Sequence, residues 1–180
     1  MRTIPGSNPG ALINFQMNYY DNISEGYDTL HKEEQIKKLS LIADQDIIEA
    51  SDSLLDVGCG TGFSLDYFDL KEATGIDPSQ GLISQYKGNK KIMLGFAEEL
   101  PFEDNSFDVV ISVTAIQNFD DIKKGLEEIK RVGNDRFVLT FLKNSPKKDE
   151  IKELISYKFQ PFYILELEEE KDIVFVIRRS

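Results

Sequence analysis

Short apolar segments alternate with amphipathic segments from residue 53 onward, and this alternation constrains the fold more than any other feature. Five apolar segments are expected to be strands: Ser53–Val57, Ala73–Asp77, Lys91–Phe96, Phe107–Val113 and Arg136–Phe141. Four are expected to be helices: Phe63–Phe68, Ser79–Tyr86, Asp120–Val132 and one from Ser145-Pro146 to about Lys158. Because strands joined through helices pair in parallel, the pattern predicts a doubly wound α/β sheet. The most apolar strand, Phe107–Val113, is expected at its centre.

The carboxyl-terminal region departs from this alternation. Phe162–Glu168 and Asp172–Arg178 are expected strands, and only Glu169-Glu170-Lys171 join them. A parallel crossover needs about a dozen residues or more, so these two strands must form an antiparallel hairpin. Gly133 follows the helix Asp120–Val132, at the place where a helix C-cap glycine belongs. The sheet is therefore predicted to be mostly parallel, with an antiparallel hairpin at its end.

The first 50 residues carry no strand-like alternation. Residues 1–10 are rich in proline and glycine and are expected to be a coil, whereas 11–50 are expected to be helical. One helical face is predicted by the spacing of Ile36, Leu39, Ala43 and Ile47. Four further aromatic side chains are too many for a solvated tail: Phe15, Tyr19, Tyr20 and Tyr27. We expect residues 1–50 to form an arm and helical cap over the carboxyl ends of the strands, where ligands bind in such sheets, and 51–180 to form the core.

Charge and cysteine content exclude several kinds of partner. The chain has 21 Lys plus Arg and 32 Asp plus Glu, a formal net charge of −11, which opposes direct binding of nucleic acid or of an anionic membrane surface. The single cysteine, Cys59, excludes an intramolecular disulfide and a zinc site built from several thiolates. No metal site is expected. A reducing compartment suits this composition, and with neither a signal core nor a long apolar run we expect a cytoplasmic protein.

A glycine-rich turn follows the first expected strand, in the sequence LLDVGCGTG at 54–62. Such a turn lets a ligand approach backbone N–H groups at the start of a helix, although it can also be only a tight structural turn. The spacing Gly58-x-Gly60-x-Gly62 differs from the G-x-G-x-x-G of dinucleotide sites, because Phe63 occupies the third glycine position. Asp56 would repel a pyrophosphate and attract an ammonium group. The turn therefore favours a ligand with an amino-acid end.

Asp77 ends the second expected strand, where an acid reaches the hydroxyls of an adenosine ribose. The alternative is that Asp77 is a helix N-cap with Pro78 as the first helical residue.

Three stretches in order resemble class I S-adenosylmethionine-dependent methyltransferases: LLDVGCGTG at 54–62, GIDPS at 75–79 and AEELPFEDNSFDVVIS at 97–112. The third looks most like the branch that includes ubiquinone- and menaquinone-biosynthesis methyltransferases. The resemblance covers about residues 50–142, with weaker similarity at Tyr19-Tyr20-Asp21 and Gly26-Tyr27-Asp28. It implies a Rossmann-like, seven-stranded sheet whose last two strands come from the hairpin. It also implies S-adenosylmethionine as cofactor, and it is not specific for a substrate.

The resemblance further implies a set of cofactor-binding residues: Asp56, Gly58, Cys59, Gly60, Asp77, Pro78, Ala97, Glu98, Val113 and Thr114. Asp56 would hold the methionine amino group, and Asp77 the ribose hydroxyls. The alanine–glutamate pair would lie at the adenine edge, and the last two residues would border the methionine moiety.

This chain departs from the family pattern at two places. The family often has an Asp before the alanine–glutamate pair, which accepts from the adenine amine; here Phe96 stands there, so that bond is absent or comes from Glu98. The segment after the fourth strand often carries a His, whereas this chain has Ile116-Gln117-Asn118-Phe119. A histidine base is therefore not available at that place.

Three residues are candidates for a catalytic role: Tyr27, Gln117 and Asn118. In related enzymes a tyrosine of the amino-terminal region folds over the cofactor, where its ring attracts the sulfonium; core packing is the alternative for Tyr27. Gln117 and Asn118 would position a nucleophile by hydrogen bonds, unless they only form a turn before a helix. Cys59 is interpreted as a packing residue rather than a nucleophile.

Methyl transfer to a small molecule is the function that these observations favour. The chain has no inserted substrate domain, and its negative charge disfavours unaided binding of nucleic acid. The first alternative is an RNA or protein methyltransferase that acts with a partner. The third strand would lie at a sheet edge, and its alternating Ile92, Leu94 and Phe96 would let a partner add a strand there. The second alternative is a cofactor-binding module without catalysis.

Overall fold

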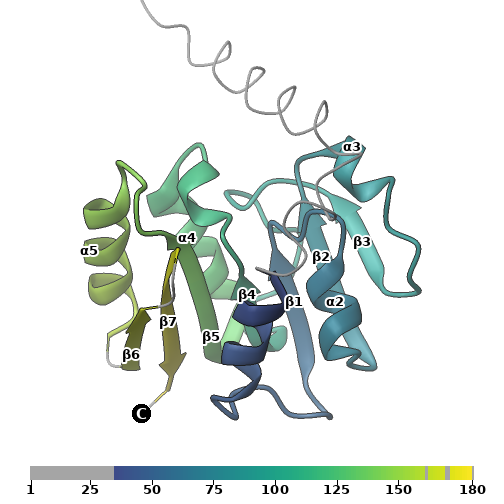
Figure 1. Ribbon diagram of the computed structural model, residues 1–180, viewed down its shortest axis with the longest axis horizontal. Coiled ribbons are helices and arrows are strands. Elements are labelled where there is room, and N and C mark those ends of the chain that lie inside the picture. The colour runs from purple at the N-terminus through teal and green to yellow at the C-terminus, as the bar shows by residue number, and fades with distance from the viewer. Residues whose placement is uncertain (1–34, 161, 169–170, 180) are drawn as a thin grey trace, which may run out of the picture.

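The structure, a computed structural model, describes residues 35–160, 162–168 and 171–179 (Figure 1). A seven-stranded sheet runs through it in the order β3-β2-β1-β4-β5-β7-β6. The strands are β1 (Ser53–Val57), β2 (Glu72–Asp77), β3 (Lys91–Leu94), β4 (Phe107–Ser112), β5 (Gly133–Leu142), β6 (Tyr163–Glu168) and β7 (Asp172–Arg178). The helices are α2 (Phe63–Phe68), α3 (Gln80–Ile83), α4 (Ile122–Val132) and α5 (Lys148–Lys158), with a 3₁₀ helix η1 (Ile116–Asn118) after β4.

The strand pairing confirms the predicted topology. Strands β1 to β5 pair in parallel, while β7 runs antiparallel to β5 and β6 antiparallel to β7. The apolar β4 lies at the centre of the sheet and β3 at one edge, as expected. The carboxyl ends of the five parallel strands consequently lie together along one side of the sheet. We call this side the carboxyl edge and the opposite side, where these strands begin, the amino edge; both differ from the outermost strands β3 and β6.

Two helices are shorter than predicted, α3 at its carboxyl end and α5 at its amino end. Helix α3 covers only Gln80–Ile83, and its N-cap is Ser79, whose hydroxyl accepts from the Leu82 N–H at 3.2 Å. Helix α5 begins at Lys148 rather than directly after Ser145. The Ser145 hydroxyl accepts from the Lys147 N–H at 3.2 Å, so this serine stabilises a turn before the helix instead of capping it.

Gly133 is the C-cap of α4, as the sequence predicts, and its N–H donates to the Ile129 carbonyl. Its φ is −86° and its ψ is 145°, which is extended backbone, and it is the first residue of β5. A Cβ at this position would lie 2.3 Å from Cε1 of Phe137 and 2.8 Å from Cγ2 of Val110. Close packing, rather than backbone conformation, therefore explains the glycine.

The sheet is covered on both faces, as Figure 1 shows. Helices α4 and α5 and the turn η1 pack on one face, through an apolar cluster that includes Leu126, Ile129 and Ile155. Helix α2 and residues 35–47 pack on the other face, through a second cluster that includes Leu39 and Leu65. No helix in the described residues is both long and apolar enough to cross a membrane.

The described chain begins in a helix that continues to residue 43. Leu39, Ile42 and Ile47 are buried against the sheet, but Ile36 and Ala43 of the predicted apolar face are exposed. The buried face of this helix includes Lys38. The prediction missed this face because a charged residue is not expected in the core. Residues 1–34, which include most of the predicted cap, lie outside the described residues, so the cap stays a prediction; the described part of it, 35–50, lies on the sheet face.

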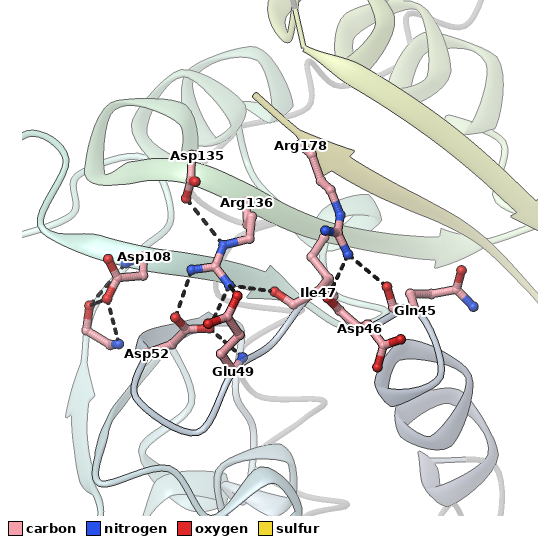
Figure 2. A network of polar contacts seen from close by, with 10 residues as sticks. Gln45, Asp46, Ile47, Glu49, Asp52, Asp108, Asp135, Arg136 and Arg178 are labelled. Atoms are coloured by element: carbon pink, nitrogen blue, oxygen red, sulfur yellow. Dashed lines mark hydrogen bonds and ion pairs between the residues drawn. The ribbon is translucent and has the colours of Figure 1, made fainter. Parts of the chain in front are cut away.

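Two arginines anchor the segment that follows this helix at the amino edge (Figure 2). Arg136 donates to both carboxylate oxygens of Asp52, at 2.8 and 2.7 Å, and to the Ile47 carbonyl at 3.0 Å. Arg178 donates to the carbonyls of Gln45 and Asp46, at 2.8 and 2.7 Å. Because Arg136 lies on β5 and Arg178 on β7, these contacts fix the chain before β1 to the sheet.

Candidate functional site

A pocket opens at the carboxyl edge and extends from the loop after β3 to the segment after β4. It contains about 860 Å³ of space, counted out through its open mouth. Its lining is Gly58, Gly60, Ile76, Asp77, Pro78, Ser79, Leu82, Gly95, Phe96, Ala97, Glu98, Val113, Thr114, Ala115, Asn118, Phe119 and Asp120. Of the predicted site residues in the described chain, the pocket brings together all except Asp56, Cys59 and Gln117.

The glycine turn after β1 folds over the end of β2. The N–H groups of Gly58 and Cys59 both donate to the Ile76 carbonyl, at 2.8 and 3.1 Å. Gly58, Gly60 and Gly62 all have positive φ, between 55° and 82°, which side chains disfavour. A Cβ on Gly58 would also lie 2.4 Å from the Cβ of Ala115. The turn thus needs glycine for its conformation and for its close approach to the segment after β4.

Asp77 ties this turn to the end of β2. Its Oδ2 accepts from the Gly60 N–H and its Oδ1 from the Ser79 N–H, each at 2.8 Å. Because Ser79 is the N-cap of α3, the alternative that Asp77 caps the helix, with Pro78 as its first residue, is wrong. The buried Asp77 lines the pocket at the carboxyl end of β2.

Asp56 lies near the end of β1, beneath the turn and outside the pocket lining. It is 2% exposed, and the Ser64 hydroxyl donates to its Oδ2, while its Oδ1 has no hydrogen-bond partner in the described part of the chain. Burial raises the pKa of this carboxyl from 3.8 to about 7; the Ser64 hydrogen bond opposes the increase and the charge of Asp77 adds to it. An unpaired buried carboxylate oxygen suits a cationic ligand group.

Cys59 packs below the turn rather than into the pocket. Its Sγ would lie 2.6 Å from a Cβ on Gly75, so the thiol fills the space above that glycine of β2. Burial, with the charges of Asp56 and Asp77, raises the pKa of the thiol well above its ordinary value. Only the backbone of Cys59 is therefore available to a ligand, in agreement with its interpretation as a packing residue.

The loop after β3 forms an apolar end of the pocket. Ala97 lines it together with Phe96, Leu82 and Phe119, and Phe96 is 41% exposed. Glu98 also lines this end, and its Oε1 accepts from the Asp121 N–H at 3.1 Å. Neither Leu82 nor Phe119 was among the predicted site residues. The aromatic at 96, in place of the family's acid, was the signal for an apolar surface here.

Residues 113–115, directly after β4, form the opposite end. Thr114 has φ +57°, a left-handed conformation that costs a β-branched residue about 1–3 kcal/mol. Its N–H donates to the Thr140 hydroxyl, and its carbonyl accepts from Gln117 Nε2, each at 2.7 Å. Gln117 therefore supports this wall from behind and Asn118 lines the pocket, so the structure brings only one of these two predicted residues to the cavity. Tyr27 lies outside the described residues.

The electrostatics of the pocket favour positive charge. Three acids line it, Asp77, Glu98 and Asp120, with Asp56 beneath, and none of the lining residues that the structure describes is Lys or Arg. A pyrophosphate would be repelled, whereas an ammonium or sulfonium group would be attracted. No group of acids, histidines or cysteines in the described ranges is arranged to hold a metal ion.

The strand order, the glycine turn, the acid at the end of β2 and the acidic pocket are together typical of a class I methyltransferase domain that uses S-adenosylmethionine. Comparison with known proteins agrees: residues 55–136 match the family described as a methyltransferase domain. The demethylmenaquinone methyltransferase of Staphylococcus aureus is 33% identical over 129 residues, which are 63% of this chain and 53% of that protein. The chain spans about half the length of the curated relatives it matches.

Solved structures share the fold over nearly the whole chain. A possible histamine N-methyltransferase of Thermotoga maritima, described as S-adenosylmethionine-dependent, has a TM-score of 0.69 at 17% identity and covers 89% of this chain and 98% of its own. A putative methyltransferase of Haloferax volcanii, in complex with the Trm112 methyltransferase activator, has a TM-score of 0.71 at 16% identity, with coverages of 91% and 97%. These likenesses show that the fold is shared. Together with the family match over residues 55–136 and the sequence relatives, they support a class I S-adenosylmethionine-dependent methyltransferase domain, and the cofactor of that class is S-adenosylmethionine.

Proposed function

We propose that the protein transfers a methyl group from S-adenosylmethionine to a small molecule. The observation that carries this proposal is the unpaired, buried oxygen of Asp56, which lies beneath a turn whose backbone is open to the same pocket that Asp77 lines. The cofactor, when bound, supplies a methyl group on a positively charged sulfur. The residues of the chain bind it, orient it and exclude water.

The pocket gives each part of the cofactor a suitable environment. Asp56 and the glycine turn would take the methionine end, near β1 and β4, and Asp77 would take the ribose at the centre. The apolar surfaces of Leu82, Phe96 and Phe119 would enclose the adenine. Glu98 is partly occupied by the Asp121 N–H, so packing contributes more than hydrogen bonding at this end.

Alignment, rather than a strong base, would drive the transfer. Holding two reactants in line can supply about 7–11 kcal/mol in favourable cases. None of the described lining residues is a histidine, and we expect an acceptor atom that is already unprotonated or easily ionised, with Asn118 orienting it. The similarity to a demethylmenaquinone methyltransferase favours a small-molecule acceptor.

Isothermal titration tests the cofactor and labelling tests the acceptor. We expect saturable binding of S-adenosylhomocysteine and none of NAD; the reverse result would overturn the proposal. The protein is then incubated with methyl-labelled cofactor and fractionated cell extract, with Asp56→Asn as the inactive control. Label in metabolites supports the proposed acceptor class, and label in RNA or protein contradicts it.

A macromolecular substrate presented by a partner is the second candidate. The edge strand β3 ends in Leu94, which is 54% exposed, and the exposed Phe96 follows it. One similar structure is a complex with a methyltransferase activator, so a partner that adds a strand to β3 would supply the missing substrate contacts. This candidate predicts labelling of RNA or protein that depends on a protein fraction and is lost in Leu94→Lys.

Two further expectations remain proposals. The free, buried Cys59 suits a reducing compartment, so we propose a cytoplasmic location, testable by cell fractionation. We also propose that the region around Tyr27 covers the pocket when cofactor is bound. Greater hydrogen-exchange protection of residues 14–30 with S-adenosylhomocysteine would support this cover, and equal protection would contradict it.

A further inference from the structure

A buried ion pair lies directly behind the pocket wall, at the carboxyl edge. Lys38 Nζ and Asp172 Oδ2 are 2.5 Å apart, and the two side chains are 4% and 0% exposed. Both contact Thr114, which lines the pocket: Lys38 Nζ donates to Thr114 Oγ1 at 2.9 Å, and Thr114 Oγ1 donates to Asp172 Oδ1 at 3.2 Å. The three residues come from the helix over 35–43, the start of β7 and the segment after β4, which are far apart in sequence.

Every polar atom of Thr114 is engaged by this network and its neighbours. Thr140 accepts from the N–H, Gln117 donates to the carbonyl, and the ion pair holds the hydroxyl. A threonine with positive φ persists only where its surroundings determine the conformation. The contacts to Lys38 and Asp172 therefore help to keep the backbone at Thr114 in its unusual shape.

The shape of this backbone decides how the wall meets the glycine turn. Thr114 lies between Val113 and Ala115, which also line the pocket. Ala115 lies very close to Gly58: a Cβ added to Gly58 would be 2.4 Å from the Cβ of Ala115. A shift at Thr114 would therefore move the wall away from the turn, at the end of the pocket assigned to methionine.

Folding alone does not require an ion pair at this place. A buried pair is often no more stabilising than apolar residues of similar volume, because both charges lose their hydration. The ion pair at the amino edge, Arg136–Asp52, also anchors the amino-terminal segment to the sheet, and neither of its residues lines the pocket. The pair at the carboxyl edge differs in that it contacts a pocket residue directly.

We propose that Lys38 is a positioning residue for the methionine end of the cofactor, acting through Thr114. This inference rests on the proposed function, since it assumes that the pocket binds S-adenosylmethionine. Its ammonium group fixes the Thr114 hydroxyl while Asp172 balances its charge. The adenosine end of the pocket, near Leu82 and Phe96, does not depend on Lys38.

The test compares two ligands that share the adenosine part. S-Adenosylhomocysteine contains the amino-acid chain, and 5′-methylthioadenosine lacks it. In Lys38→Met the charge-assisted contact to Thr114 is lost, so we expect the affinity for S-adenosylhomocysteine to fall about tenfold. The affinity for 5′-methylthioadenosine should change less than twofold. The matched control, Arg136→Met, removes the other ion pair and should lower Tm without changing the ratio of the two affinities.

Further variants separate positioning from stability. Lys38→Met combined with Asp172→Asn removes the unpaired buried charge, so stability should recover while binding of S-adenosylhomocysteine stays weak. Thr114→Val should reproduce the selective loss and Thr114→Ser should not, which provides the test even if Lys38→Met does not fold. Equal weakening of both ligands, or recovery of affinity in the double variant, would overturn the inference alone. Wild-type protein that binds neither ligand would overturn the proposed function as well.

Discussion

Asp52 and Asp56 lie near the two ends of β1, and both are buried, but their surroundings differ. At the amino edge Asp52 accepts from two nitrogens of Arg136 and from the Glu49 N–H, so both its oxygens are satisfied (Figure 2). At the carboxyl edge, one oxygen of Asp56 accepts from the Ser64 hydroxyl, and the other has no hydrogen-bond partner among the residues described. A fully paired carboxylate stabilises a fold, whereas an unpaired one costs free energy until a cation reaches it.

Replacing each aspartate by asparagine tests this contrast most strongly. Asp56→Asn should weaken binding of S-adenosylhomocysteine by about a hundredfold, since a charge-assisted contact to the ligand amine is worth about 1.5–3 kcal/mol. It should not lower the free energy of unfolding, because the charge it removes is poorly compensated. Titration calorimetry and urea denaturation measure the two quantities.

Asp52→Asn is the matched variant, with the opposite expectation. It should lower the free energy of unfolding by about 2 kcal/mol, less than for a fully buried pair because Arg136 is partly exposed, and leave the affinity unchanged. If Asp52→Asn weakens binding as much as Asp56→Asn does, the two edges do not differ in function.

Asp77→Ala should have the next largest effect. It removes the ribose acceptors and also releases the N–H groups of Gly60 and Ser79. We expect S-adenosylhomocysteine to bind at least tenfold more weakly to a protein that still folds. Asp121→Ala is the control: this acid caps α4 from outside the pocket lining, so its loss should cost about 1 kcal/mol of stability and little affinity. Unchanged affinity in Asp77→Ala would limit this acid to a structural role.

The pH dependence of binding should follow the ionisation of Asp56. Its pKa is about 7 in the free protein, and a bound ammonium group would lower it, so binding below pH 7 must release a proton. Affinity for S-adenosylhomocysteine should therefore rise about fivefold from pH 6 to pH 7 and then level off. Calorimetry in buffers of different ionisation enthalpy detects the proton, and Asp56→Asn should abolish the effect; proton uptake on binding would contradict it.

Rising pH has the opposite effect on stability, through the same ionisation of Asp56. Because the pKa of Asp56 in the folded protein lies above its ordinary 3.8, the free protein retains this proton where the unfolded chain has lost it. Between about pH 4 and pH 7 this group therefore lowers the free energy of unfolding as pH rises.

Local sequence patterns predicted the strands and the glycine turn well, because each depends on neighbours in the chain. Strands β1 and β7 have the predicted bounds, and Asp77 lies in the pocket as the spacing after Gly58 implied. Positions that depend on distant contacts were less accessible. Gly133 makes room for Phe137, and nothing in the helix before it indicates this.

Charged residues on apolar faces were the main source of error. Periodicity counts Lys38 as polar and places it outside the core, although its partner Asp172 makes its burial possible. The prediction therefore shifted the buried face of the helix toward Ile36 and Ala43, which are exposed. Gln117 was expected at the pocket for its amide, but that amide binds the Thr114 carbonyl. Neither contact has a signal in local spacing.

Arg178→Met should have the smallest effect and sharpens the comparison from the amino edge. The guanidinium donates to the carbonyls of Gln45 and Asp46, and Arg178 is partly exposed, so its loss should lower the free energy of unfolding by only about 1 kcal/mol. These carbonyls follow the helix that bears Lys38, but they lie at its far end from the pocket. Binding of S-adenosylhomocysteine should therefore stay within twofold of wild type. A tenfold loss in this variant would mean that the amino edge also shapes the site, and the distinction between an anchoring edge and a binding edge would fail.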